Sequence, residues 1–327
     1  MKQVLVTGAG GFIGSHLVEE LIEAGYHVRA LVKYNSRNDW GNIELLPDMV
    51  KNEIEVVSGN IEDPFLCQKI TKGVEHIYHL AALIAIPYSY VAPESYVNTN
   101  IKGTMNILQA ALHNDVQKVV HTSTSEAYGT ALYTPIDEKH PLQGQSPYSA
   151  SKIGADKIAE SYYLSFGLPV ATLRPFNNYG PRQSARAVIP TIISQALTTK
   201  HKKIKLGALE PVRDLLYVKD SAKAFIKVAL CNETRGEVLN AGYGKGISIG
   251  DLARRILDMI DPEIAIVSDA DRIRPEKSEV QKLICNSEKA KAMIGWEPSY
   301  NLNEGLKATI SFVAKNLDQY KPEIYNL

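Results

Sequence analysis

The chain has 327 residues, 45% of them hydrophobic, which is enough for about two folded domains and excludes a mainly disordered protein. Its 36 basic residues balance its 36 acidic residues and no basic block stands out, so we expect no nucleic-acid partner. The three cysteines lie far apart without a CxxC spacing, which argues against disulfides and a zinc site and fits a reducing cytosol.

Short β-branched runs alternate with amphipathic segments through the first half of the chain. Strands are expected at residues 3–6, 28–32, 54–57, 76–81, 119–122 and 170–173. A helix follows the first strand and ends near Gly25. A second helix, between the fourth and fifth strands, has one apolar face made of Val97, Ile101, Met105, Leu108 and Leu112. Buried strands separated by helices indicate right-handed βαβ units, so the pattern predicts an α/β fold with a Rossmann-type, doubly wound parallel sheet.

The pattern changes after Pro175, where segments become shorter and richer in Pro and Gly, beginning with turn residues at 177–181. We expect a dinucleotide-binding domain over residues 1–175. Residues 176–327 are expected to form mostly a smaller substrate-binding lobe, with strands from about 212–245 returning to the main sheet.

The chain shows no membrane-associated segment. Its longest apolar stretch, around residues 80–87, is far shorter than the ~20 residues that span a bilayer. The first residues lack the apolar region of a signal peptide. We expect a cytoplasmic protein without a membrane partner.

A glycine-rich loop, TGAGGFIG, joins the first strand to the first helix. Gly8 permits the tight turn, Gly11 lets the backbone approach a pyrophosphate, and Gly14 allows close helix–strand packing. The helix N-terminus at Phe12 and Ile13 supplies N–H groups and a positive dipole end. A flexible turn without a ligand is the alternative, but the position between a strand and an amphipathic helix favours dinucleotide binding.

The residue at the end of the second strand distinguishes NAD from NADP. NAD enzymes have a carboxylate there for the ribose 2′-hydroxyl, whereas this chain has Val32, followed by Lys33 and Arg37. The missing carboxylate and the two cations favour NADP over NAD, unless both cations are ordinary solvated loop charges.

Tyr148 and Lys152 are four residues apart, which places both on one face of a helix. A free tyrosine has a pKa near 10, so a phenolate at neutral pH needs nearby positive charge. A lysine and an oxidised nicotinamide ring supply it, and the phenolate can then remove a hydroxyl proton while hydride leaves the same carbon. An exposed Tyr/Lys helix face is the alternative, which the preceding dinucleotide loop disfavours.

Over nearly its whole length the chain resembles the extended branch of the short-chain dehydrogenase/reductase superfamily, whose members act on nucleotide-activated sugars. The matching segments are residues 7–14, 79–82, 98–104, 122–129, 148–152, 174–175, 178–182, 213–214, 217–218 and 220. The resemblance implies that Tyr148 is the base toward the sugar 4-hydroxyl, that Lys152 contacts the nicotinamide ribose and that Thr124 hydrogen-bonds the reacting oxygen. It also places Ile61, Ala81 and Asn60 at the cofactor. Asn60 stands where the family usually has an Asp against adenine.

Residues 122–129 indicate the reaction within this superfamily. A 4,6-dehydratase needs a base for the C5 proton, and Glu126 is the candidate. A 4-epimerase needs none, because it only removes and returns a hydride. The dTDP-glucose dehydratases have an Asp as general acid before this Glu, where this chain has Ser125, as in the GDP-mannose dehydratases. Protonation of the leaving hydroxyl is then left to Glu126 or to a water.

Residues 85–90, 143–147, 183–190 and 274–279 most resemble the N-acetylglucosamine-nucleotide 4,6-dehydratases of the legionaminic acid pathway. We therefore expect conversion of UDP- or GDP-N-acetylglucosamine to the 4-keto-6-deoxy sugar. A UDP-glucuronate decarboxylase stays open because it shares the T-S-E triplet and Arg186 could meet a carboxylate. A 4-epimerase also stays open. A non-catalytic dinucleotide sensor is disfavoured because it would need only the glycine loop.

The substrate-binding residues come from the resemblance. Arg213 and Arg274 correspond to arginines that clamp phosphates, Asn178 to an amide at a phosphate or sugar hydroxyl, and Arg186 lies in a matching segment. No metal-ligand motif is present. The helix beginning near Tyr96 and the helix that carries Tyr148 match the pair that forms homodimers in this superfamily.

Overall fold

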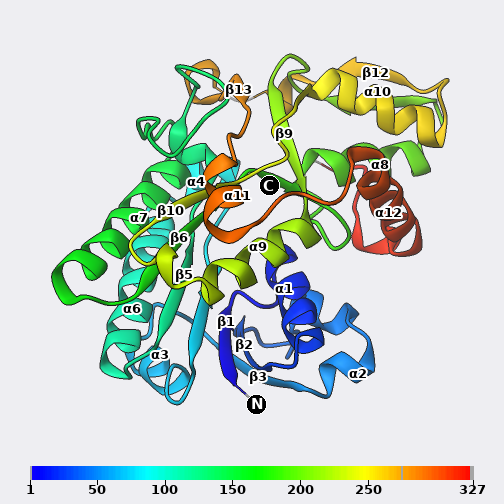
Figure 1. Cartoon of the computed structure of the whole chain (residues 1–327). Helices are drawn as coiled ribbons and strands as arrows, with labels where there is room; N and C mark the ends of the chain where they lie inside the picture. Colours follow the sequence, from blue (N-terminus) through cyan, green and yellow to red (C-terminus); the bar gives the residue numbers. More distant parts are fainter. Residues whose placement is uncertain (1, 274, 325–327) are drawn as a thin grey trace.

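The computed structural model describes residues 2–273 and 275–324. Its larger part is a parallel sheet with helices on both faces, and its smaller lobe, with α8, α10 and α12, lies above the sheet in Figure 1. No helix within the described ranges is both long and apolar enough to cross a bilayer.

The main sheet has seven parallel strands in the order β10-β6-β5-β4-β1-β2-β3. Its strands are β1 (Gln3–Thr7), β2 (His27–Lys33), β3 (Ile54–Gly59), β4 (His76–His79), β5 (Lys118–Thr122), β6 (Val170–Pro175) and β10 (Val238–Ala241). The strand order reverses between β1 and β4, and open α/β sheets bind their ligands at the carboxyl ends beside such a point. The predicted Rossmann-type parallel sheet is confirmed.

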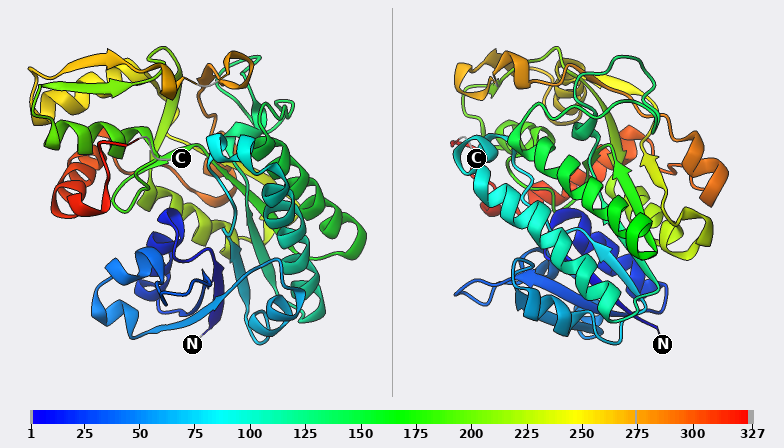
Figure 2. Two further views of the ribbon diagram at one scale, coloured as in Figure 1. Left: turned by 180° about the vertical axis from the view of Figure 1, so that it is seen from behind. Right: turned by 90° about the vertical axis from the view of Figure 1, so that its left-hand side faces the viewer.

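Helices cover both faces of this sheet. Figure 2 shows α6 and α7 running side by side along one face, and α1 packs against α9 on the other. The helices of this part are α1 (Phe12–Glu23), α2 (Asp48–Lys51), α3 (Pro64–Ile70), α4 (Ile86–Val91), α5 (Pro93–Tyr96), α6 (Gly103–His113), α7 (Pro147–Phe166), α9 (Val218–Leu230) and α11 (Glu288–Ile294). Two apolar clusters, one under each layer, hold the helices to the sheet.

The helix expected around residues 97–112 differs from its prediction. Its first part, Val97–Lys102, is a π-helical turn that continues into α6. Leu108 is fully buried, but Val97 is 51% exposed and Met105 is 40% exposed. A π-helical turn has a different rotation per residue from an α-helix. The expected apolar face is therefore not buried as one stripe.

The smaller lobe has its own sheets and core. A four-stranded sheet contains β7 (Asn177–Tyr179), β9 (Val212–Tyr217), β11 (Gly246–Ser248) and β13 (Lys282–Leu283), and a separate pair contains β8 (Lys203–Leu206) and β12 (Ala265–Ser268). Helices α8 (Val188–Thr198), α10 (Ile249–Ile260) and α12 (Leu302–Lys315) pack around one apolar cluster. Of the segment 212–245 expected in the main sheet, only β10 pairs there. Strand β9, residues 212–217, pairs within the lobe.

A buried histidine joins the glycine-loop helix to the lobe. His16 of α1 lies 3.0 Å from the carbonyl oxygen of Pro181 through Nε2, and Arg182 Nε lies 3.3 Å from the same nitrogen. Nδ1 accepts from Arg182, whose guanidinium also pairs with Glu19. Burial, reinforced by the Arg182 charge, lowers the pKa of His16 to about 3.

This histidine makes folding stability depend on pH. In the unfolded chain His16 binds a proton below its ordinary pKa of about 6.5, whereas in the folded chain it stays neutral down to about pH 3. The free energy of unfolding therefore decreases as the pH falls from 6.5 to 3. In urea unfolding, the free energy of unfolding of His16→Gln, whose side chain cannot titrate, should decrease by about 2 kcal/mol less than that of the wild type between pH 6.5 and pH 5. The exposed His27, changed to Gln, serves as control. Parallel stability curves for the wild type and His16→Gln would contradict the assignment.

Candidate active site

Two adjoining hollows lie where the sheet meets the lobe. The first, of about 500 Å³, runs from the glycine loop past the start of α7. The second, of about 320 Å³, lies within the lobe between α8 and β9. The two hollows share six of their lining residues: Glu126, Asn177, Asn178, Gln183, Arg186 and Ala187. The two hollows therefore adjoin and form one site.

The glycine loop forms one wall of the first hollow. Gly8 has a φ of +70°, and a Cβ on it would lie 2.8 Å from the backbone nitrogen of Ala81. A Cβ on Gly14 would lie 2.2 Å from the carbonyl oxygen of Gly8. Helix α1 begins after Gly11, which has no side chain to cap the first N–H groups. Gly11, Phe12, Ile13 and Gly14 line the hollow, so the loop fits a dinucleotide pyrophosphate.

Gly14→Ala should weaken cofactor binding. The added Cβ would overlap the Gly8 carbonyl, so the loop must move away from the pyrophosphate position. We expect the purified variant to retain at least tenfold less nicotinamide cofactor than the wild type, measured after acid release (about 1.4 kcal/mol). Gly250→Ala in α10 meets only ordinary contacts and is the control. Equal cofactor content in Gly14→Ala and the control would show that the loop does not hold the dinucleotide.

The residues expected near the adenosine lie together at the ends of β2 and β3. Lys33 pairs in register with Gly59, directly before Asn60, and both Lys33 and Arg37 are exposed. The Asn60 side-chain oxygen accepts from the backbone N–H of Glu62, and Ile61 is buried against Gly103. None of these four expected residues lines the first hollow, whereas Ala81 does.

Helix α7 positions the tyrosine and the lysine. Ser146 and Ser149 form a capping box that fixes the start of the helix. Tyr148 and Lys152 lie one turn apart, are 7% and 4% exposed, and both line the first hollow. The Lys152 ammonium donates to the carbonyl oxygen of Thr122 at 2.6 Å. The expected Tyr/Lys pair is thus brought together at the hollow.

The pKa shifts of Tyr148 and Lys152 suit a tyrosine base that is deprotonated only when a positive charge is bound beside it. Burial raises the pKa of Tyr148, and a hydrogen bond with Thr124 opposes this shift. Burial lowers the pKa of Lys152 to about 8, with the charge of Asp156 opposing it. Any further positive charge bound beside Tyr148 favours its phenolate.

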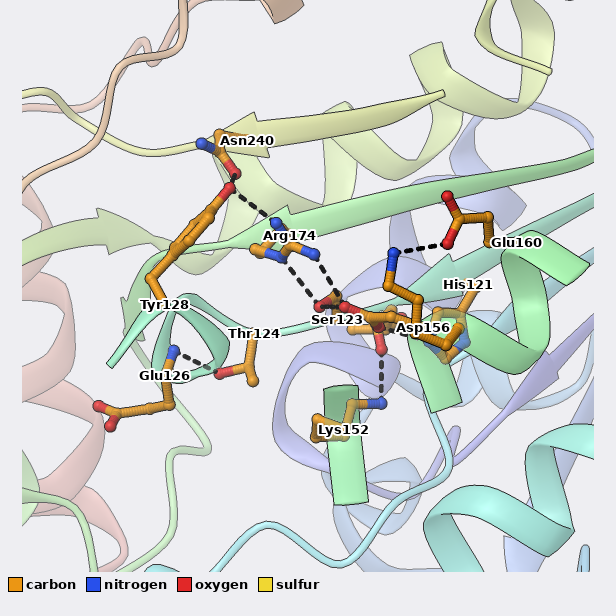
Figure 3. Close-up of polar contacts among 12 residues, drawn as sticks. His121, Ser123, Thr124, Glu126, Tyr128, Lys152, Asp156, Glu160, Arg174 and Asn240 are labelled. Carbon is orange, nitrogen blue, oxygen red and sulfur yellow. Dashed lines mark hydrogen bonds and ion pairs between the residues drawn. The ribbon is translucent and has the colours of Figure 1, made fainter. Parts of the chain in front are cut away.

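Thr124, Ser125 and Glu126 follow β5. Residues Ser125–Tyr128 form a single 3₁₀ turn, and the Thr124 hydroxyl accepts from the Glu126 N–H at 3.3 Å. Figure 3 shows the Glu126 carboxylate directed away from Thr124. All three residues line the first hollow, and Glu126 also lines the second. A carboxylate therefore stands where the two hollows meet, near Tyr148.

A network of buried charges lies behind Lys152, and sequence reasoning missed it (Figure 3). Asp156 lies 3.0 Å from His121, accepts from Ser123 at 2.6 Å and pairs with Arg174 at 2.8 Å. Burial alone would raise the pKa of Asp156, but His121, Arg174 and Lys152 hold it well below its usual range. The signal was available, because Asp156 continues the four-residue spacing of Tyr148 and Lys152.

The expected phosphate-binding residues are only partly brought together. Arg213 is 7% exposed, lines the second hollow and donates to Glu279 at 2.8 Å. Its neighbour in the sequence, Asp214, accepts three backbone N–H groups. Arg186 is exposed and lines both hollows. Arg274 lies outside the described residues.

Two further observations complete the site. The Asn178 amide donates to the Phe176 carbonyl oxygen at 2.8 Å and its oxygen accepts from Ser221, so the protein itself orients this side chain. Arg272 also lines the second hollow and was not anticipated from the sequence. Among the described residues there is no group of three side chains that could hold a metal ion.

Comparison with known proteins agrees with this geometry. The family described as "GDP-mannose 4,6 dehydratase" matches residues 5–309. A "Putative UDP-glucose 4-epimerase" of Methanocaldococcus jannaschii is 33% identical, over 96% of this chain and 99% of that protein. The human "dTDP-D-glucose 4,6-dehydratase" is 30% identical, over 98% of this chain and 92% of that protein.

A solved structure shows the same fold with ligands. The dTDP-glucose 4,6-dehydratase DesIV of Streptomyces venezuelae, with NAD and TYD bound, superimposes with a TM-score of 0.84 at 28% identity, covering 98% of this chain and 99% of that chain. The match spans both the glycine loop and the lobe. The chain belongs to the GDP-mannose 4,6-dehydratase family, the NAD(P)-dependent nucleotide-sugar dehydratases and epimerases of the extended short-chain dehydrogenase/reductase superfamily.

Proposed function

We propose that the protein is a 4,6-dehydratase that converts UDP- or GDP-N-acetylglucosamine to the 4-keto-6-deoxy sugar. One observation supports this more than any other: Glu126 lines both hollows, and Tyr148 lines the first of them close enough for the Glu126 charge to raise its pKa. A sugar with its nucleotide in the second hollow would meet a phenol and a carboxylate at once. The legionaminic acid pathway is the route that the sequence resemblance favours for such a product.

The residues divide the reaction between them. Tyr148 removes the proton of the C4 hydroxyl, with the Lys152 charge stabilising the phenolate and Thr124 donating to the reacting oxygen. The nicotinamide, when bound, supplies a reversible hydride acceptor. The C4 ketone acidifies the C5 proton, and Glu126 removes it. The C6 hydroxyl leaves as water, taking its proton from Glu126 or a water, because Ser125 is a poor acid. With the cofactor bound, the hydride taken from C4 would return to C6 and a proton would add at C5, which gives the 4-keto-6-deoxy sugar with no net redox change.

Two other activities remain as second candidates. The name of the Methanocaldococcus relative favours a 4-epimerase, which needs no carboxylate at residue 126. A UDP-glucuronate decarboxylase needs a cation for the sugar carboxylate, and Arg186, exposed at both hollows, could serve. Glu126 at the junction supports the dehydratase over the epimerase, and the resemblance of residues 85–90, 143–147, 183–190 and 274–279 supports it over the decarboxylase. The buried Tyr148–Lys152 pair argues against a sensor without catalysis.

We also propose that the cofactor is NADP rather than NAD. Lys33 pairs in register with Gly59 at the end of β3, both Lys33 and Arg37 are exposed, and β2 ends without a carboxylate, which favours a 2′-phosphate there. The NAD in the DesIV structure makes NAD the alternative. Cofactor released from the purified protein identifies which dinucleotide it carries.

We propose that the protein is a cytoplasmic homodimer formed through α6 and α7. Large apolar side chains on these helices and the preceding π-helical turn are exposed: Val97, Met105, Leu164 and Phe166. Sedimentation would show a monomer if this face has another role.

The proposed reaction is tested by the mass of the product. The protein is incubated separately with UDP-N-acetylglucosamine, GDP-N-acetylglucosamine and UDP-glucuronate. We expect a product lighter by one water from one of the first two. Loss of CO₂ would indicate a decarboxylase, an isomer of equal mass would indicate an epimerase, and no turnover would favour a sensor. Each of these three results would overturn the proposal.

A further inference from the structure

A single buried arginine contacts both the helix that carries Tyr148 and the turn that contains Glu126. Arg174, at the end of β6, is 3% exposed, and three of its nitrogens donate to three different elements. Nε donates to Ser123 of the segment after β5 at 3.0 Å, Nη1 to the Tyr128 hydroxyl at 2.7 Å, and Nη2 to Asp156 of α7 at 2.8 Å. Figure 3 shows these contacts converging on the guanidinium.

The contact of Arg174 with Asp156 connects it to Tyr148, the proposed base at C4. Asp156 lies two helical turns after Tyr148 on the same helix, and it is also held by His121 and Ser123. A shift of Asp156 therefore moves the whole face of α7 that carries Tyr148.

The contact of Arg174 with Tyr128 connects it to Glu126, the proposed base at C5. Tyr128 is fully buried and ends the four-residue 3₁₀ turn that contains Glu126. Its hydroxyl donates to Asn240 at 2.8 Å, and its ring lies 4.6 Å below the Arg174 guanidinium. Because the turn is so short, a displacement of Tyr128 displaces Glu126.

We propose that Arg174 is a positioning residue that fixes Glu126 relative to Tyr148, so that the ketone formed on one side of the sugar is within reach of the carboxylate on the other. The planar guanidinium suits this role, because its N–H groups point in fixed directions. A buried cation also has to keep its partners, so the three elements move together. The inference rests on the proposed dehydration.

Tyr128→Phe tests it by removing the hydrogen bond between Arg174 and the turn that contains Glu126, together with the hydroxyl's bond to Asn240. The variant keeps the ring and leaves the Arg174–Asp156 pair intact. The substrate is whichever of UDP- and GDP-N-acetylglucosamine the wild type dehydrates. Formation of reduced nicotinamide in a single turnover reports C4 oxidation, and C5 exchange in D₂O with release of product reports elimination. We expect oxidation within about twofold of the wild type and elimination slowed at least tenfold, since small misplacements of catalytic groups are costly.

Tyr162→Phe is the matched control, because Tyr162 is a buried tyrosine on α7 whose hydroxyl donates to Gln109. Both steps are measured on the same molecules, so their ratio is unaffected if part of the variant fails to fold. Tyr128→Phe slowing both steps equally, slowing only oxidation, or slowing neither would overturn the inference. If the wild type forms no dehydrated product, the proposed function fails instead, and this inference with it.

Discussion

Tyr148→Phe should lose reduction of the bound nicotinamide when substrate is added, by about 10³-fold. The substitution keeps the ring, which packs 6.3 Å from Tyr96, and removes only the hydroxyl that would take the C4 proton. Thr124 lacks the acidity to replace it, and Lys152 is held by the Thr122 carbonyl. Rapid-mixing absorbance of reduced nicotinamide measures this step directly.

Cofactor content must be equal in the wild type and the variant for this comparison. Tyr162→Phe should reduce its nicotinamide at the wild-type rate. Reduction within a few-fold of the wild type in Tyr148→Phe would mean that another group removes the C4 proton, and Tyr148 would lose its assigned role.

Glu126→Gln should separate the two halves of the reaction. The amide keeps the size of the side chain but cannot take a proton, so C4 oxidation proceeds and elimination stalls. We expect dehydrated product to form about 10²–10⁴-fold more slowly while reduced nicotinamide accumulates. Product mass and nicotinamide absorbance, followed in the same reaction, measure both effects.

The exposed Glu160 on α7, which pairs with Lys157, gives the matched control Glu160→Gln. It should leave both measurements unchanged. Normal dehydration by Glu126→Gln would remove Glu126 from the mechanism. Loss of the oxidation step as well would show that the carboxylate supports substrate binding rather than elimination.

The sequence predicted the main sheet well because its strands and its glycine loop are local patterns. Buried β-branched runs mark the strands, and the positions of Gly8 and Gly14 follow from the contacts that a Cβ would make. The Tyr148–Lys152 spacing likewise needs only a helix.

Other features depend on contacts between distant residues and could not be predicted this way. Arg213 pairs with Glu279, 66 positions along the chain, rather than with its neighbour. Strand β9 has the same β-branched and aromatic character as the main strands, but it pairs with β7, β11 and β13 in the lobe. The three hydrogen bonds of Arg174 join the residue after β5, the 3₁₀ turn and α7, and no local pattern predicts them.

The central claim is that Tyr148 and Glu126 act on the same hexose ring. The most direct test uses UDP- or GDP-N-acetylglucosamine with deuterium at C4, followed by mass spectrometry and NMR of the product. We predict a product lighter by one water with the deuterium at C6, because the hydride taken from C4 returns there after elimination. A product of unchanged mass with deuterium still at C4 would contradict the account and identify an epimerase.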